Sequence, residues 1–221
     1  MFKYMIISNN VSNIIVFKKL SEELSRLIEK EGWLVRPYAS SQLKHFMSLE
    51  KEEQNWVIHR LEDYLAICKK VHRAGRPLKD ARFLVEEGLR HYNFSCDLKV
   101  ESIIKPSYVV EFYGKDHRQI FRTFNYFEFT SYTLEEIYCR PWYVLYQRDE
   151  EVTRQLIESV EPIIEDQIMD PVFFDMPEHS IDERTSLEKL RMMAKEIAVT
   201  PLVQTKKLVG YLNVIQVRLA D

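Results

Sequence analysis

Residues 129–142 read FTSYTLEEIYCRPW, and this stretch decides how the C-terminal half of the chain folds. Thr133 followed three residues later by Glu136 is the pattern of a capping box, which predicts the start of a short helix. Pro141 stops that helix or restarts the chain as a new one, because proline has no amide donor. Asp149 is placed to cap a longer helix. The apolar residues of that helix are Val152, Leu156, Ile157 and Val160.

Strands are predicted on both sides of these helices. Residues 107–112 and 118–124 are rich in β-branched and aromatic residues and flank a turn, so they predict a hairpin. Three more strands are predicted after the helices, at residues 172–174, 194–203 and 208–219. The predicted order is therefore two strands, short helices, a longer helix and three strands.

This order resembles the PAS domain, the sensory fold of signalling proteins. Members commonly show an aliphatic–Thr–Gly–Tyr–Ser segment before a Glu–Glu pair, and residues 129–137 align with that pattern without a gap, although Ser131 replaces the usual Gly. Thr123 stands where the family often has Asn. Further matches are Pro141–Trp142, Arg148–Asp149 and the segments 199–202 and 206–211. The resemblance covers residues 104–219 and implies a five-stranded antiparallel sheet that curls around a small apolar hollow.

The segment between the longer helix and the last two strands is the least regular part of the resemblance. Residues 161–195 hold extra polar residues, and residues 176–186 are predicted to be a loop. A strand in this region is therefore expected to be difficult to place.

The N-terminal half is predicted to be helical. Apolar residues recur at steps of three and four from Val11 to Ile28 and predict an amphipathic helix that stops at Gly32. Residues 1–8 are predicted to form a short strand or an ordered lead-in. A second helical region follows over residues 40–73, and a third helix begins at Pro77.

The chain is thus predicted to be α+β with two parts. Residues 1–100 form a helical domain or dimerising extension, and residues 101–221 form the PAS-like domain. The first hundred residues carry 17 basic and 13 acidic side chains, a net charge of +4, and the remainder carries 14 and 21, a net charge of −7.

One repeat in the second helical region has two interpretations. Its members follow at steps of 4, 3, 4 and 3, as in a coiled coil, but a coiled coil usually needs three to four heptads. The repeat therefore favours one packed face of a helical bundle and remains a candidate seam of a homodimer, which is the predicted oligomeric state. The residues are Val57, Leu61, Tyr64, Cys68 and Val71.

The resemblance implies a pocket between the sheet and its helices. Strand alternation puts Val209, Tyr211, Asn213, Ile215 and Val217 on one face of the last strand, which would look inward. Most candidate lining residues lack donors and acceptors, so we expect a small apolar or amphipathic ligand, or side chains that fill the space. The candidate lining is Trp142, Leu145, Leu156, Ile157, Ile197, Val199, Tyr211, Asn213 and Ile215.

The sequence argues against two cofactors of the family. Photosensory members that bind flavin carry a Cys in the short helix, where this chain has Trp142, and Cys139 lies three residues earlier. Heme needs an axial ligand, often His, aimed into the pocket. The longer helix has no His, and His117 and His179 fall in a turn and in the predicted loop. The identity of a ligand is left open.

Catalytic and metal-binding motifs are missing from the sequence. It has no HExxH, GxSxG, GxGxxG or Walker A segment, and no His/Cys pair with structural-zinc spacing. The adjacent Glu135 and Glu136 are interpreted as the solvated first turn of a helix. Three scattered cysteines predict a reducing, cytoplasmic setting, and apolar runs of four or five residues predict no membrane helix.

These observations predict a non-enzymatic, signal-sensing and dimerising regulatory module. Its PAS-like domain would bind a small ligand or a protein partner and act on an output domain or partner. The alternative is a transcription-related regulator whose basic N-terminal helices contact nucleic acid, and residues 69–82 are the most basic stretch. A net charge of −3 and a pI near 6.1 argue against a strongly basic binder of this kind.

Overall fold

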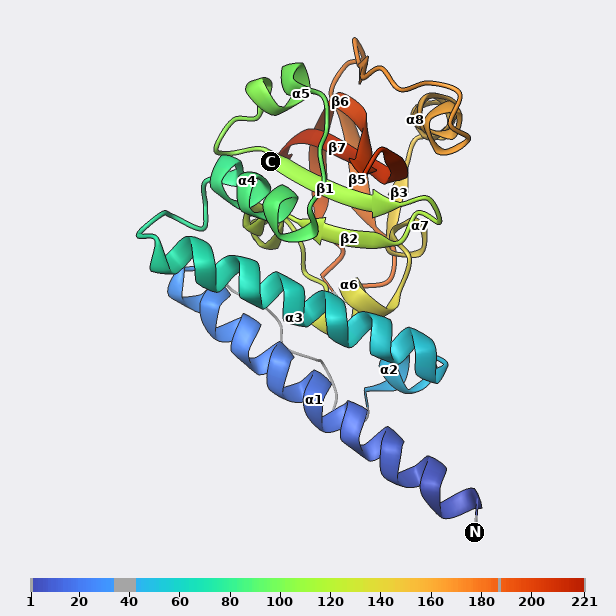
Figure 1. The fold of residues 1–221 in the computed structure, drawn as a ribbon. Helices are drawn as coiled ribbons and strands as arrows, with labels where there is room; N and C mark the ends of the chain where they lie inside the picture. The colour runs from blue at the N-terminus through green and yellow to red at the C-terminus, as the bar shows by residue number, and fades with distance from the viewer. Residues whose placement is uncertain (1, 34–42, 187, 221) are drawn as a thin grey trace.

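The computed structural model describes residues 2–33, 43–186 and 188–220, with side chains from residue 12 onward (Figure 1). A helical layer packs on a curled antiparallel sheet. The helices are α1 (Phe2–Lys30), α2 (Lys44–Met47), α3 (Lys51–Arg73), α4 (Ala81–Tyr92), α5 (Leu98–Ile103), α6 (Leu134–Cys139), α7 (Trp142–Leu145) and α8 (Glu150–Ile164), with a 3-10 helix η1 (Phe124–Glu128). The strands are β1 (Val109–Gly114), β2 (Gln119–Arg122), β3 (Tyr146–Arg148), β4 (Val172–Phe173), β5 (His179–Glu183), β6 (Arg191–Gln204) and β7 (Lys207–Leu219).

Helix α3 lies between α1 and the sheet, and the two long helices run side by side (Figure 1). A capping box between Glu50 and Glu53 starts α3, and Gly75, at φ +69°, follows its end. The packed-face interpretation of the repeat is confirmed and the candidate dimer seam is corrected, because these residues pack inside one chain and are at most 3% exposed. This correction applies to Val57, Leu61, Tyr64, Cys68 and Val71.

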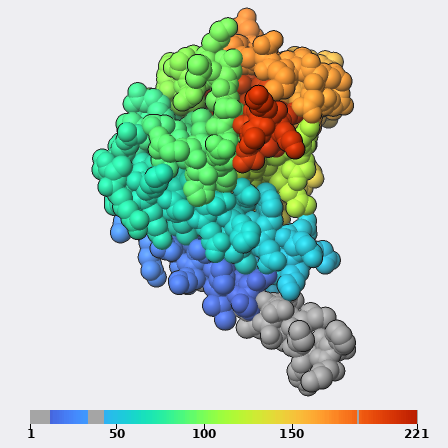
Figure 2. Space-filling view, in the orientation of Figure 1, coloured from blue at the N-terminus to red at the C-terminus, as the bar shows by residue number. Residues whose placement is uncertain are grey.

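Helix α4 joins the helical layer to the sheet. The Asp80 carboxylate accepts a hydrogen bond from the Arg82 amide and caps the helix. A Cβ added at Gly88 would lie 3.3 Å from the Phe112 ring and 3.4 Å from the Phe121 ring, so the small residue permits close packing on β1 and β2. Figure 2 shows α3 and α4 forming much of this side of the molecule, with α8 exposed in orange at another edge.

One apolar core contains residues of both halves of the chain. Tyr64 of α3 packs against Phe121 of β2, with ring centroids 5.6 Å apart. The expected boundary between residues 100 and 101 falls inside α5. Among the described residues, no helix has the length and apolar character that a membrane span requires.

Two hairpins build the centre of the sheet. The hairpin of β1 and β2 lies beside the hairpin of β6 and β7, because β1 pairs with β7 from Val109–Ile215 to Gly114–Gly210. The order is β2-β1-β7-β6-β5-β3, and β4 also pairs with β6. The antiparallel, curled sheet is confirmed, but it has seven strands among the described residues rather than five.

Two local predictions were wrong. Residues 179–183 of the predicted loop form β5, which pairs with β6 and β3. Its inward positions are His179, Ile181 and Glu183, so the burial alternates while the hydrophobicity does not. At the N-terminus, residues 2–8 belong to α1 instead of a strand or lead-in. The helix ends before Gly32, as predicted, and that glycine has φ +84°.

The carboxylate of Glu135 is buried, which corrects its interpretation as solvated. It is 4% exposed and accepts hydrogen bonds from the amides of His45, at 2.6 Å, and Phe46, at 3.0 Å. These amides belong to the first turn of α2. The first amides of a helix have no acceptor within the helix, so they need one from elsewhere. Glu135 therefore ties α6 to the helical layer.

Replacing Glu135 with glutamine is expected to lower the free energy of unfolding by about 1–2 kcal/mol, because the neutral amide is a weaker acceptor for two buried amides. Urea unfolding followed by circular dichroism measures this change. Glu128→Gln is the matched control, since Glu128 is exposed, and it should change stability by less than about 0.5 kcal/mol. Equal effects of the two substitutions would contradict the capping role.

Candidate functional site

Residues 129–133, the FTSYT segment, position the site, and their polar groups are already hydrogen-bonded within the protein. Thr130 and Ser131 donate to the carboxylate of Glu183 on β5, the Ser131 amide at 2.7 Å. The Tyr132 hydroxyl accepts from the backbone amides of residues 184 and 185 at 3.1 and 3.0 Å. Thr133 caps α6 by accepting from the Glu136 amide at 3.2 Å, as its capping box predicts. The segment therefore fixes α6 and α7 against β5.

Two small hollows lie on the sheet, the first beside α7 and α8 and the second beside η1 and α7. The first, the apolar hollow, has a volume of about 60 Å³. It is lined by Glu111, Tyr113, His117, Trp142, Arg148, Leu156, Ile157, Val160, Phe174, Val199, Tyr211 and Asn213. The second, the arginine hollow, has a volume of about 50 Å³. It is lined by Val109, Glu111, Tyr113, Arg122, Tyr126, Phe129, Trp142, Tyr146, Arg148, Ile181, Met192, Ile215 and Val217.

Most of the candidate lining residues meet in these spaces. Leu145 instead lines a wider cleft outside them. Ile197 sits at a bulge in β6 and packs against the main core. Ile215 lines the arginine hollow. The other six, Trp142, Leu156, Ile157, Val199, Tyr211 and Asn213, line the apolar hollow.

Four charged residues at these hollows were not predicted from the sequence. Glu111 of β1 lies directly opposite Arg122 of β2 in the strand register. Arg148 Nη2 of β3 lies 3.2 Å from Glu196 Oε1 of β6. Glu111, Arg122 and Glu196 are at most 7% exposed. The sequence feature that could have indicated these buried charges is a charged residue at an inward position of a predicted strand. Glu111, within the predicted strand 107–112, is such a residue.

Burial and neighbouring charges shift the pKa values of these groups in different directions. Burial raises the pKa of Glu196, and Arg148 opposes that shift. Burial lowers the pKa of Arg122, but Tyr126 and Glu111 outweigh it and hold the pKa above its usual value. The Arg122 guanidinium lies 3.8 Å from the centre of the Tyr126 ring. Burial followed by Arg148 lowers the pKa of His179, which favours a neutral imidazole.

Several polar atoms at the hollows lack hydrogen-bond partners within the part of the chain that the structure describes. They are Arg122 Nη1, Arg148 Nε, Trp142 Nε1 and Asn213 Oδ1. Buried polar atoms are almost always hydrogen-bonded, and leaving one unpaired costs about 1–3 kcal/mol. Water or a ligand in the hollows would supply the missing bonds.

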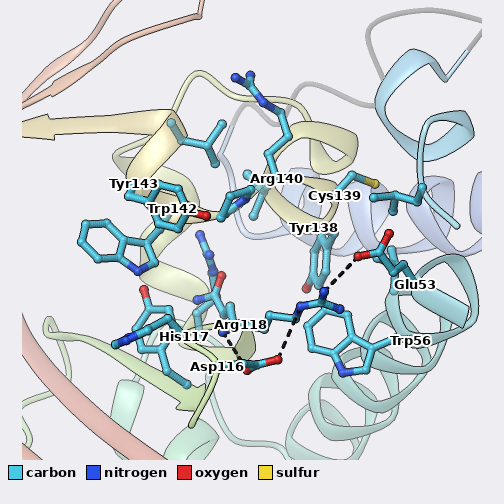
Figure 3. Close-up of a pocket in the computed structure, with 18 residues that line it drawn as sticks. Glu53, Trp56, Asp116, His117, Arg118, Tyr138, Cys139, Arg140, Trp142 and Tyr143 are labelled. Carbon is cyan, nitrogen blue, oxygen red and sulfur yellow. Dashed lines mark hydrogen bonds and ion pairs between the residues drawn. The ribbon is translucent and has the colours of Figure 1, made fainter. Parts of the chain in front are cut away.

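A wider cleft of about 450 Å³ adjoins both hollows (Figure 3). Its walls are α3, the turn between β1 and β2, and the segment from α6 to α7. Trp56 stands on the α3 side, across from Trp142 and His117 (Figure 3). Tyr113 and Trp142 line the cleft and both hollows, so the three spaces adjoin one another at these two side chains.

The cysteines and carboxylates provide no sign of redox or metal chemistry at this site. Burial raises the pKa of the Cys139 thiol, which lines the cleft, and so reduces its thiolate fraction. Within residues 2–33, 43–186 and 188–220, no group of three or more His, Cys, Asp or Glu is arranged to hold a metal ion.

No family model matches this chain, and no curated protein or solved structure matches it either.

Proposed function

We propose that this chain is a non-enzymatic, PAS-like sensory module that binds a small molecule in the hollows between its sheet and α7–α8. The observation that carries the proposal is an apolar space bordered by buried donors without partners. A ligand at a site of this kind gains both from apolar burial and from hydrogen bonds to the unpaired donors. The sequence of strands and helices from β1 to β7 supports the PAS resemblance.

The packing of α8 supports a role in sensing. All fifteen residues of this helix are described, and only Ile163 is buried. Leu156 and Ile157 cover the apolar hollow while remaining partly or largely exposed. A helix with so few buried contacts can shift at a small free-energy cost, so a ligand that prefers one position of α8 would change its population.

Contacts between the site and the helical layer offer a route for such a change. Arg118, in the turn between β1 and β2, pairs with Glu53 of α3 at 2.9 Å (Figure 3). His117 of the same turn hydrogen-bonds the Tyr211 hydroxyl through Nδ1 at 2.9 Å, next to the apolar hollow. Movement at the hollow would therefore act on α3 through this turn. The proposed output is a partner protein or a further domain.

The nucleic-acid alternative receives less support from the packing. Within residues 69–82, four of the basic side chains have carboxylate partners, which reduces the positive charge offered to a phosphate backbone. These pairs are Lys69–Glu23, Lys70–Glu87, Arg76–Glu86 and Arg82–Asp80. The homodimer stays a prediction, and any interface would lie outside the buried face of α3.

Leu156→Trp is expected to fill the apolar hollow and abolish ligand binding. A library of small metabolites, screened by thermal shift, should give compounds that raise the Tm of the wild-type protein and leave that of Leu156→Trp unchanged. The substitution itself should cost no more than about 1–2 kcal/mol, because the side chain is only partly buried.

Leu98→Trp is the matched control, since Leu98 is 78% exposed on α5, remote from the hollow lining. It should keep every wild-type response. A library that raises the Tm of neither protein, or raises both equally, would contradict binding in the hollow.

A further inference from the structure

We propose that the ligand of these hollows is a short-chain carboxylate, with its acid group in the arginine hollow and its chain in the apolar hollow. This inference rests on the proposed function and specifies its ligand. It follows from which polar atoms at the site are already satisfied and which are not.

Each carboxylate at the site already has a donor on one oxygen or a cation beside it. Glu111 Oε1 accepts from Gln119 Nε2 at 3.2 Å. Glu196 accepts from Asn213 Nδ2 at 3.3 Å through Oε2. Its Oε1 has no hydrogen-bond partner among the described residues but lies 3.2 Å from Arg148 Nη2, so its charge is already paired. A positively charged ligand group would have to compete for these acceptors with groups that are covalently held in place.

The donors show the opposite situation. Arg122 Nη1, Arg148 Nε and Trp142 Nε1 have no hydrogen-bond partner among the described residues, and all three side chains line the arginine hollow. They come from β2, β3 and α7, three separate elements. Three unpaired N–H groups call for an acceptor, and a carboxylate offers two oxygens with about four lone-pair positions.

The apolar hollow matches the other end of such a molecule. Leu156, Val160 and Val199 contribute apolar surface, and Trp142 and Arg148 border both spaces. Each hollow exceeds the about 10–15 Å³ that a cavity needs to hold one water molecule, so the two together have room for several non-hydrogen atoms. Butyrate, with six non-hydrogen atoms, fits this size. The unpaired Asn213 Oδ1 lies beside the chain, where it would accept from a ligand hydroxyl.

The test compares butyrate, butyramide and butylamine, which have similar shapes and differ in the head group. Isothermal titration calorimetry at constant ionic strength should give butyrate at least tenfold tighter binding than the other two, because only butyrate places a negative charge beside both arginines. Butyramide binding as tightly as butyrate would overturn the carboxylate inference and leave the proposed function standing. Binding of none of the three at millimolar concentration, together with no library compound that raises the Tm, would overturn both.

The variant Trp142→Phe removes one donor and keeps the ring. It should weaken butyrate binding about tenfold and leave butyramide nearly unchanged. Trp56→Phe is the control, because Trp56 lines the outer cleft and neither hollow. A second variant, Arg148→Lys, keeps the charge beside Glu196 and should also weaken butyrate binding. Full butyrate affinity in both Trp142→Phe and Arg148→Lys would contradict the assigned head-group site.

Discussion

Replacing Glu183 with alanine is expected to lower the free energy of unfolding by about 3–5 kcal/mol, although this residue is remote from the helical layer. Its carboxylate is 3% exposed. It accepts hydrogen bonds from the Ser131 amide and hydroxyl, the Thr130 hydroxyl, the Ser186 hydroxyl and the Leu190 amide. No lysine or arginine is among these donors, which are all hydroxyl groups and backbone amides.

The expected loss of stability is large because the substitution removes the acceptor and leaves its buried donors in place. In Glu183→Ala, the backbone amides of Ser131 and Leu190 would remain buried without an acceptor, and each such group costs about 1–3 kcal/mol. Water entering the space left by the side chain would recover only part of that cost. Equilibrium unfolding in urea, followed by circular dichroism and by tryptophan fluorescence, measures the change.

Asp182→Ala is the control for this substitution. Asp182 is the next residue on β5 and pairs with Arg191 at 2.6 Å, but its side chain is 39% exposed. Surface ion pairs contribute about 0–1 kcal/mol, so the control should stay within that range. A Glu183→Ala protein as stable as Asp182→Ala would show that the carboxylate is not the fixing point of the FTSYT segment.

The sequence predicted best what depends on neighbours in the chain. The capping box at Thr133, the cap at Asp149 and the stop at Gly32 are each set by contacts within a few residues. Strand alternation also placed Tyr211 and Asn213 correctly at the apolar hollow. These signals are local or follow from the two-residue repeat of a strand.

What the sequence did not predict depends on partners far along the chain. Glu183 places a buried carboxylate on β5, and two of the residues that donate to it, Ser131 and Thr130, lie 52 and 53 residues earlier. Glu135 finds its amides about 90 residues earlier, so a pair of adjacent glutamates gave no sign that one was buried. Arg122 and Arg148 meet at one hollow from different strands. Charged residues are normally expected at the surface, which hid all four.

The central segment of the PAS resemblance, residues 129–133, therefore has a mainly structural role. Thr130, Ser131 and Tyr132 use their polar atoms on the backbone and on Glu183. The groups with unpaired donors, Arg122 and Arg148, lie outside that segment. Similarity in this motif can thus indicate the fold while leaving the ligand undetermined, which is why the ligand has to be argued from the hollows themselves.

Leu61→Asp is expected to abolish cooperative unfolding rather than to produce a folded monomer. Leu61 is fully buried in α3 at the centre of the face once considered as a dimer seam. Removing a buried leucine costs about 2–5 kcal/mol, and an unpaired buried carboxylate adds several more. That total approaches or exceeds the 5–15 kcal/mol by which most domains are stable.

The control Ala66→Asp separates this core effect from the cost of placing Asp in a helix. Ala66 is exposed on the same helix, and the substitution should cost only about 0.7 kcal/mol. Circular dichroism during heating and sedimentation velocity at micromolar concentration distinguish the two roles of this face. A packed face predicts that Leu61→Asp loses its melting transition while Ala66→Asp keeps one. A seam would instead give a Leu61→Asp protein that melts cooperatively and sediments at half the wild-type mass. That result would restore the coiled-coil interpretation, because only a face that is open in the single chain tolerates a charge at its centre.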